Sequence, residues 1–204
     1  MKGMIKDALI LFAITLIAGL MLGVVNDITK EPIAQQEQKA KNEACQNVFA
    51  AADSFEAQEL ADSAQIEQVL TDAGISGADV DELMAAKDAS GALLGYVITV
   101  TDHEGYGGDI QFSMGITNEG TLNGISLLSI SETAGLGMKA KEDAFMSQFT
   151  GIPAQMLEVT KSAKTADTEI EAISGATITS KAVTYGIDAG LAYYNSLVGG
   201  ATNE

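Results

Sequence analysis

The segment Ser174–Ser180, which reads SGATITS, holds the residue types in this chain that are best suited to chemistry. It lies where a short apolar stretch gives way to a helical pattern, so Ser174 or Thr177 is placed to cap a helix. A helix start also presents unpaired N–H groups and a positive dipole end, which bind phosphate without arginine. Gly175 and Ala176 let a bulky ligand approach the backbone. Two interpretations stay open: an ordinary capped helix, or a phosphate site with the Thr177 hydroxyl as attachment point.

Two segments upstream also have residue types suited to ligand contact. Gly105–Gly108 reads GYGG, whose glycines permit backbone conformations closed to other residues, while Tyr106 offers an aromatic face. Its plainer interpretation is a hairpin loop. Glu132–Gly137 reads ETAGLG and follows a predicted strand, so it forms a loop able to bring side chains and backbone amides to a ligand.

The sequence around these segments predicts an α+β fold, in which helices pack on an antiparallel sheet. Residues 92–101 are rich in Val, Ile and Tyr, and residues 110–116 alternate apolar with polar side chains. With a third run at 121–130 they predict an antiparallel meander. A long final helix with one apolar stripe is predicted from about Thr177 to Val198.

A stalk helix is predicted before the sheet. Residues 27–52 are polar and rich in Gln, Lys, Glu and Ala, with Pro32 placed for a first helical turn after Thr29. A turn is predicted around residue 75. The smaller predicted elements are helices at about 55–70, 78–87 and 139–149 and a short strand at 157–160.

An uncharged apolar run extends over residues 8–25 and is just long enough to cross a membrane as a helix. A cleaved signal peptide, the competing interpretation, requires a shorter run and a small-x-small cleavage site, which the following residues match poorly. Lys2 and Lys6 precede the run, so the positive-inside rule places the amino terminus in the cytoplasm. We expect a single-pass protein of the cytoplasmic membrane, with its carboxyl-terminal domain on the outer face. The expected divisions are a transmembrane anchor at 1–26, a stalk helix and helical segment at 27–90, and a folded domain at 91–204.

Composition narrows the range of partners and chemistries. The chain has eleven basic residues, all lysine, and twenty-eight acidic residues, for a net charge of -17. Nucleic acid is therefore an unsuitable partner. A lone Cys45 makes no internal disulfide, and a lone His103, expected in a solvated loop, supplies no multi-histidine metal site. We predict no metal ligands.

The three segments together resemble the FMN-binding domain family. Ser174–Thr177 matches its Ser-Gly-Ala-Thr, whose threonine carries FMN through the phosphate, and Gly105–Ile110 and Glu132–Gly137 match two further motifs in the same order. Ala134 stands where the family has proline, and Glu171 where it commonly has aspartate. The resemblance implies FMN joined by a phosphoester to Thr177. The other implied cofactor-binding residues are Ser174, Gly175, Ala176, Thr179, Ser180, Glu132, Thr133, Gly135, Leu136, Gly137, Tyr106 and Gly107.

The whole chain, with its single span and outward domain, resembles the G subunits of Rnf complexes, which pass electrons between ferredoxin and NAD+ and move sodium ions or protons. The resemblance implies a one-electron relay, in which the chemistry belongs to the flavin, so no catalytic acid or base is expected of this chain. It also implies two kinds of partner: the other Rnf membrane subunits, and a flavin transferase that donates FMN from FAD with magnesium.

The sequence leaves three alternatives open. The C subunit of the sodium-translocating NADH:quinone oxidoreductase shares the motif but tends to be longer. A flavinylated carrier outside any ion pump would use the same chemistry. A non-redox anchored binding module would use Ser174–Ser180 only to cap a helix.

Overall fold

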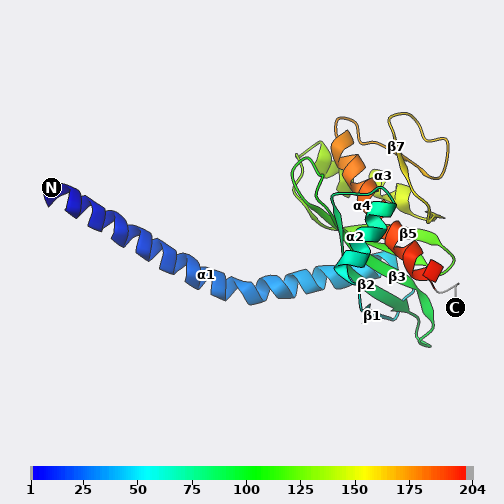
Figure 1. Ribbon diagram of the computed structural model, residues 1–204, viewed down its shortest axis with the longest axis horizontal. Helices are drawn as coiled ribbons and strands as arrows, with labels where there is room; N and C mark the ends of the chain where they lie inside the picture. The colour runs from blue at the N-terminus through cyan, green and yellow to red at the C-terminus, as the bar shows by residue number, and fades with distance from the viewer. Residues whose placement is uncertain (1, 201–204) are drawn as a thin grey trace. The chain divides into compact units, whose positions relative to one another are not determined.

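A computed structural model describes residues 2–200 of the chain (Figure 1). The chain divides into two compact units, Met1–Ala40 and Lys41–Glu204. The second unit contains all three segments singled out above, so the candidate site depends on that unit alone.

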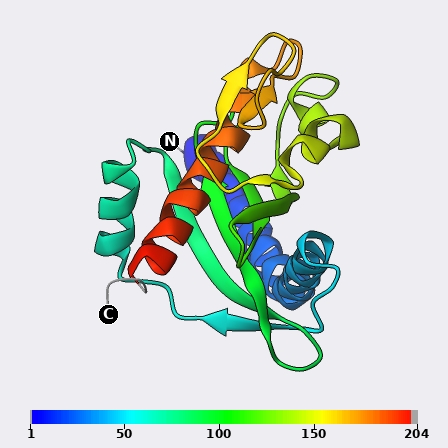
Figure 2. The same ribbon diagram turned by 90° about the vertical axis from the view of Figure 1, so that its right-hand side faces the viewer.

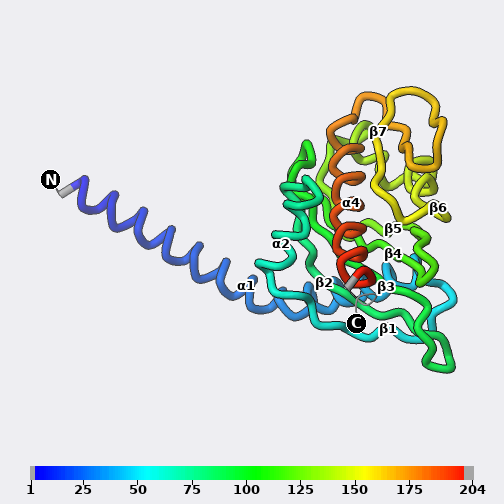
Figure 3. The backbone as a smooth tube through the Cα atoms, turned by 45° about the vertical axis from the view of Figure 1, so that its right-hand side comes forward, coloured from blue at the N-terminus to red at the C-terminus, as the bar shows by residue number. Residues whose placement is uncertain are grey.

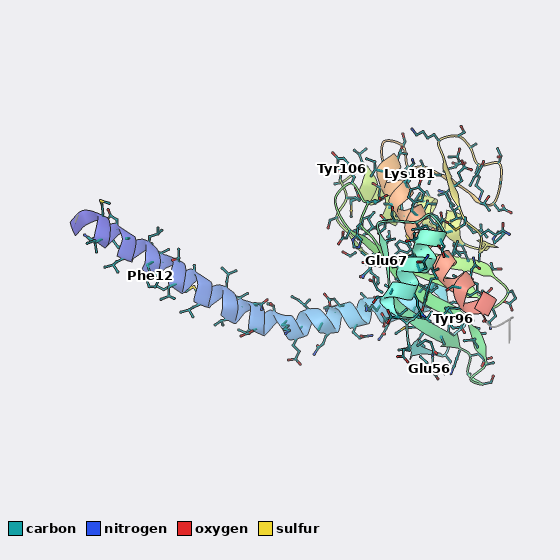
Figure 4. The ribbon with its side chains drawn as sticks, viewed as in Figure 1. Phe12, Glu56, Glu67, Tyr96, Tyr106 and Lys181 are labelled. Carbon is teal, nitrogen blue, oxygen red and sulfur yellow. The ribbon has the colours of Figure 1, made fainter. Side chains whose placement is uncertain are left out.

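The first unit belongs to a single helix, α1 (Lys2–Val48), which has Pro32 inside it. The Thr29 hydroxyl donates to the Val25 carbonyl oxygen at 2.9 Å, so it bonds back along the helix and does not cap a new one. The helical stalk predicted at 27–52 is confirmed as far as Val48, but its predicted start after Thr29 is wrong, because α1 continues through this point. The apolar side chains of this helix are exposed, as Phe12 is in Figure 4 with 63% of its surface accessible. By length and composition α1 can cross a membrane.

The second unit is built on a six-stranded antiparallel sheet, in which strands adjacent in sequence are adjacent in space (Figure 3). The predicted meander is confirmed as its centre, and β4 pairs with β3 and β5 along nearly its whole length. Core side chains alternate along β4, where Ile110, Phe112, Met114 and Ile116 are fully buried. The strands are β1 (Ser54–Gln58), β2 (Ala78–Lys87), β3 (Leu93–Asp102), β4 (Ile110–Thr117), β5 (Thr121–Ile130) and β6 (Ile152–Pro153).

The helix predicted at 78–87 is wrong, because this segment is β2. Its Ala, Glu, Leu, Met and Lys residues favour a helix in isolation. In the sheet, however, the segment pairs with β1 and β3, and Leu83 and Ala85 are buried. The helix predicted at 55–70 is correct only in its second part, because β1 precedes α2 (Ser63–Asp72). The side chain of Asp62 begins α2 by accepting a hydrogen bond from the Ala64 N–H at 2.9 Å.

The long final helix is confirmed as α4 (Thr177–Gly200), which lies across one face of the sheet (Figure 2). Ile187 and Leu191 of α4 are fully buried in the main core, with Ile98 and Phe112 of the sheet. Two glycines bring the helix close to the strands. A Cβ at Gly186 would lie 2.9 Å from the Phe112 ring, and one at Gly190 would collide with Met114.

The other face of the sheet carries a smaller apolar cluster. Cys45 and Val48 from the end of α1 pack there with Phe49, Ala86 and Val97. Burial raises the pKa of the Cys45 thiol to about 11, so the thiol stays protonated and unreactive at neutral pH.

Short elements connect β5 to α4. The helix predicted at 139–149 is present as three short pieces, η1 (Gly137–Lys141), α3 (Asp143–Met146) and η2 (Ser147–Phe149). The strand predicted at 157–160 is present as β7 (Glu158–Thr160), which pairs in parallel with β8 (Glu169–Glu171).

Candidate functional site

The three sequence segments meet at one pocket of about 500 Å³. One wall comes from the loop between β3 and β4, one from the loop that leads from β5 into η1, and one from the first turn of α4. This volume lies within the usual range for cofactor pockets. The lining residues are Tyr106, Glu132, Thr133, Leu136, Gly137, Gly175, Ala176, Thr177, Ile178 and Thr179.

The start of α4 leaves its capping position without a side-chain acceptor. Ala176 precedes the first helical residue, Thr177, and the first intrahelical bond runs from the Ser180 N–H to the Ala176 carbonyl oxygen at 3.0 Å. The N–H groups before Ser180 therefore have no acceptor within the helix. Thr177 is half-buried beside them at the pocket wall. This turn can accept an anion.

Ser180, which is fully buried, ties the preceding loop to the helix. Its hydroxyl oxygen accepts the Ile173 N–H at 2.9 Å and donates to the Ala176 carbonyl oxygen at 2.9 Å. It therefore supports the Gly175 turn, whose φ of +79° favours glycine. Ser180 acts behind the pocket and does not line it.

Replacing Ser180 with alanine should destabilise the fold by about 1–3 kcal/mol, because the Ile173 N–H loses its buried acceptor. The matched control is Ser196→Ala on the exposed side of the same helix, where the hydroxyl only donates to Tyr193. Denaturant unfolding of the purified protein measures both. Equal losses in the two variants would contradict the role given to Ser180.

The polar floor of the pocket is formed by Glu132 and Thr179. Glu132 is 8% exposed, and its Oε1 accepts the Gly107 N–H at 3.2 Å, which links two of the three segments. The Thr179 hydroxyl is buried and has no hydrogen-bond partner within residues 2–200. A Cβ at Gly137 would lie 2.6 Å from both Glu132 Oε2 and Thr179 Oγ1, so only glycine leaves this floor open. A buried hydroxyl without a partner fits a ligand with a polar edge.

The rim of the pocket is apolar. Tyr106 is 70% exposed, Ile178 52% and Leu136 44%. Tyr106 lies at the end of the sheet where α4 begins, whereas Tyr96 and Glu56 lie toward the other end (Figure 4). Sequence reasoning did not include Ile178, although an exposed apolar side chain next to Thr177 was an available signal. Such a rim suits a flat aromatic ligand.

The other predicted residues surround the pocket without lining it. Ser174 is exposed beside it, and Gly135 forms the turn of its loop with a φ of +76°. A Cβ at Gly107 would collide with the backbone of Ser131, so this glycine permits close contact of two loops. Glu171 lies outside the lining, where its carboxylate accepts the Lys164 N–H at 2.9 Å.

His103 lies in the exposed loop after β3, as expected, but it bridges two carboxylates. Its Nδ1 lies 2.9 Å from Asp109 Oδ1, and its Nε2 lies 3.1 Å from Asp79 Oδ2. Hydrogen bonds to Asp109 and then to Asp79 raise the pKa of His103 to about 9, so the imidazole is charged at neutral pH. These contacts fasten the loop that carries Tyr106.

Comparison with known proteins identifies the family. The FMN-binding domain model matches residues 105–192, and the RnfG N-terminal region model matches residues 1–48. The chain is 32% identical over 198 residues to the G subunit of the Na+-translocating ferredoxin:NAD+ oxidoreductase complex of Acetobacterium woodii, covering 96% of this chain and 94% of the relative. The chain belongs to the RnfG family. It is thus a subunit of a ferredoxin:NAD+ oxidoreductase complex, and it contains an FMN-binding domain, as the sequence motifs predicted.

Two further likenesses agree with the RnfG assignment. The G subunit of the proton-translocating ferredoxin:NAD+ oxidoreductase complex of Clostridium ljungdahlii is 31% identical over 207 residues, covering 96% of this chain and 97% of the relative. Among solved structures, NqrC of Shewanella oneidensis matches with a TM-score of 0.52 at 17% identity, covering 76% of this chain and 88% of that chain. The likeness to NqrC concerns the fold, and it confirms the predicted helix followed by an antiparallel sheet with helices.

Proposed function

We propose that this RnfG protein is a membrane-anchored electron carrier that holds FMN in the pocket through a phosphoester on Thr177 Oγ. The observation that carries the proposal is the convergence of three family motifs on one pocket, with the Thr177 hydroxyl at the uncapped first turn of α4. FMN, when bound, supplies reversible electron uptake, and the protein supplies position and surroundings.

The pocket residues have distinct roles in this proposal. The N–H groups of the first turn of α4 bind the phosphate oxygens, which matters in a chain without arginine. Gly175 and Ala176 leave room for the phosphate and the ribityl chain. The apolar rim shields the faces of the ring, and the Thr179 hydroxyl bonds its polar edge. No side chain of the pocket is needed as an acid or base.

Orientation and partners follow from the anchor and the family. Lys2 and Lys6 favour an amino terminus in the cytoplasm, which puts the FMN-binding domain on the outer face. There a covalent link prevents loss of the cofactor. The partners are the other Rnf subunits and a flavin transferase that matures the protein. The division at residues 26 and 90 stays a prediction; the compact units of the structure meet at residues 40 and 41.

Coexpression of the full chain with a flavin transferase tests the attachment. The wild type should gain the mass of one FMN, less water, on the peptide that contains Thr177, and should fluoresce in a denaturing gel. Thr177→Val, which keeps the shape and removes the hydroxyl, should lose the adduct completely.

Thr177→Ser is the matched control, because it restores a hydroxyl at the same position and should recover at least part of the adduct. Both variants should unfold within about 1 kcal/mol of the wild type, because Thr177 is half-buried at a helix end. An adduct on Thr177→Val, or none on the wild type with active transferase, would refute the attachment.

A further inference from the structure

Asp102 is a buried carboxylate for which the proposed electron carrier has no assigned use. It is the last residue of β3 and is fully inaccessible to solvent. Its Oδ1 accepts the Glu104 N–H at 2.9 Å, but its Oδ2 has no hydrogen-bond partner within the described part of the chain. An ionised carboxylate with an unpaired buried oxygen is costly, so this group readily binds a proton.

The surroundings of Asp102 strengthen this tendency. Its sheet neighbours are Ala78 on β2 and Ile110 on β4. On the helix side, a Cβ built at Gly186 of α4 would lie 3.3 Å from the Cβ of Asp102. Desolvation raises the pKa of Asp102 to about 6, with smaller increases from Glu104 and Asp109. The hydrogen bond from the Glu104 N–H and the charge of His103 oppose this increase. The carboxylate therefore titrates near physiological pH, at a site closed to bulk water.

Asp102 is connected to the pocket along two routes. The loop that begins at Asp102 carries Tyr106 to the rim, and its Gly107 N–H donates to Glu132 in the floor. Along α4, Gly186 beside Asp102 is seven residues from Thr179 of the floor. At the helical rise this corresponds to about 10 Å. Asp102 therefore contacts α4 about two helical turns from the floor of the pocket.

We propose that Asp102 is a redox-linked proton site, whose affinity for a proton rises when the pocket receives an electron. The proposal rests on the proposed function, because it requires flavin in the pocket. One electron enters from the donor of the oxidoreductase complex. Where Asp102 is ionised before reduction, a hydronium ion of the solvent gives up a proton by breaking one of its O–H bonds, and the proton forms a new O–H bond with Asp102 Oδ2; no bond of the protein breaks. On reoxidation the electron and the proton leave again.

Coulomb's law gives the expected size of the coupling. If the charges are separated by the spacing of Gly186 and Thr179 along α4, about 10 Å, and the effective dielectric constant is about 20, one added negative charge raises the pKa of a carboxyl group by about one unit. This is a tenfold change in proton affinity. By linkage, the charged carboxylate lowers the affinity of the pocket for an electron by the same factor, which corresponds to about 60 mV for a one-electron couple.

Asp102→Asn tests the proposal, because asparagine keeps the acceptor for the Glu104 N–H and the side-chain volume but cannot titrate. The midpoint potential of FMN in the full-length protein is measured from pH 5 to pH 8. The difference between variant and wild type should grow from near zero at pH 5 to about 60 mV at pH 8, with the variant more positive. Protonation of the flavin itself is common to both proteins and cancels in this difference.

Glu104→Gln is the matched control, because it removes an exposed carboxylate in the same loop and leaves Asp102 able to titrate. It should keep the size of the wild-type change with pH and move that change only to slightly lower pH, because the charge of Glu104 contributes to the raised pKa of Asp102. Redox-difference infrared spectra supply a second measurement. A carbonyl stretch of a protonated carboxyl group should appear on reduction near pH 6.5 in the wild type and be absent in Asp102→Asn.

The outcomes separate this proposal from the proposed function. The FMN mass on the Thr177 peptide is checked first, and a protein without the adduct is titrated with saturating free FMN. If neither form of FMN binds, the proposed function fails and the role of Asp102 fails with it. If FMN binds but the midpoint difference is zero or independent of pH, only the role of Asp102 is refuted.

Discussion

Gly137→Ala is expected to lower the affinity of the pocket for FMN at least tenfold. The added methyl group would lie 2.6 Å from Glu132 Oε2, 2.6 Å from Thr179 Oγ1 and 2.8 Å from Glu132 Cβ. The ends of the two side chains can shift, but the Cβ of Glu132 is fixed by the backbone. Relief of such overpacking costs about 1–3 kcal/mol, and it moves the carboxylate that holds the Gly107 N–H. The added methyl group would fill the floor of the pocket, and the β3–β4 loop would lose the hydrogen bond that joins it to Glu132 in that floor.

Titration of the unmodified protein with free FMN, followed by quenching of flavin fluorescence, measures this loss. The matched control is Ala134→Ser, which adds one atom to an exposed position of the same loop outside the pocket lining. It should bind FMN with the wild-type affinity. Normal binding by Gly137→Ala would show that FMN does not reach the floor formed by Glu132 and Thr179.

The sequence predicted the elements whose residues follow one clear pattern. The strands between residues 92 and 130 are rich in β-branched residues or alternate apolar with polar residues. The helix α4 carries an apolar stripe and begins just after Gly175. The predicted positions of these elements therefore agree with the structure. The segment 78–87 is predicted wrongly because its residues prefer a helix, whereas pairing with β1 and β3 decides its conformation. In the sequence, Pro32 favours the start of a helix, because proline is disfavoured in a helix interior. The structure shows instead that α1 continues through Pro32.

The site was predictable as motifs but not as geometry. The motifs predicted that the segments 105–110, 132–137 and 174–180 act together, and the structure brings them to one pocket. Spacing alone could not show that Glu132 accepts the Gly107 N–H, or that the Thr179 hydroxyl is left without a partner in the described part of the chain. Nor could it show that Asp102 is buried, because its neighbours in sequence, His103 and Glu104, are exposed. Such features depend on contacts between segments far apart in the chain.

Asp188→Asn is expected to stabilise the protein at alkaline pH and to leave its stability unchanged at about pH 4. Asp188 lies on α4 with 4% of its surface exposed, and its Oδ1 accepts the Leu157 N–H at 2.8 Å. Burial raises its pKa from 3.8 to about 7, an increase that the Leu157 hydrogen bond only partly offsets. The folded protein therefore binds this proton more tightly than the unfolded chain does. Its contribution to stability is complete below about pH 4 and is lost as the pH rises through 7.

Asparagine keeps the acceptor for Leu157 but has no charge to bury, so the variant should exceed the wild type at pH 8 by about 2–4 kcal/mol. Thermal unfolding of the full-length protein in detergent, followed from pH 4 to pH 8, measures the difference. Asp88→Asn is a control of opposite sign, because a hydrogen bond from the Ser90 hydroxyl and others from backbone N–H groups lower the pKa of that exposed carboxylate. A stabilisation of Asp188→Asn that is equal at both ends of this pH range would mean that the pKa of Asp188 is not raised in the folded protein above its value in the unfolded chain.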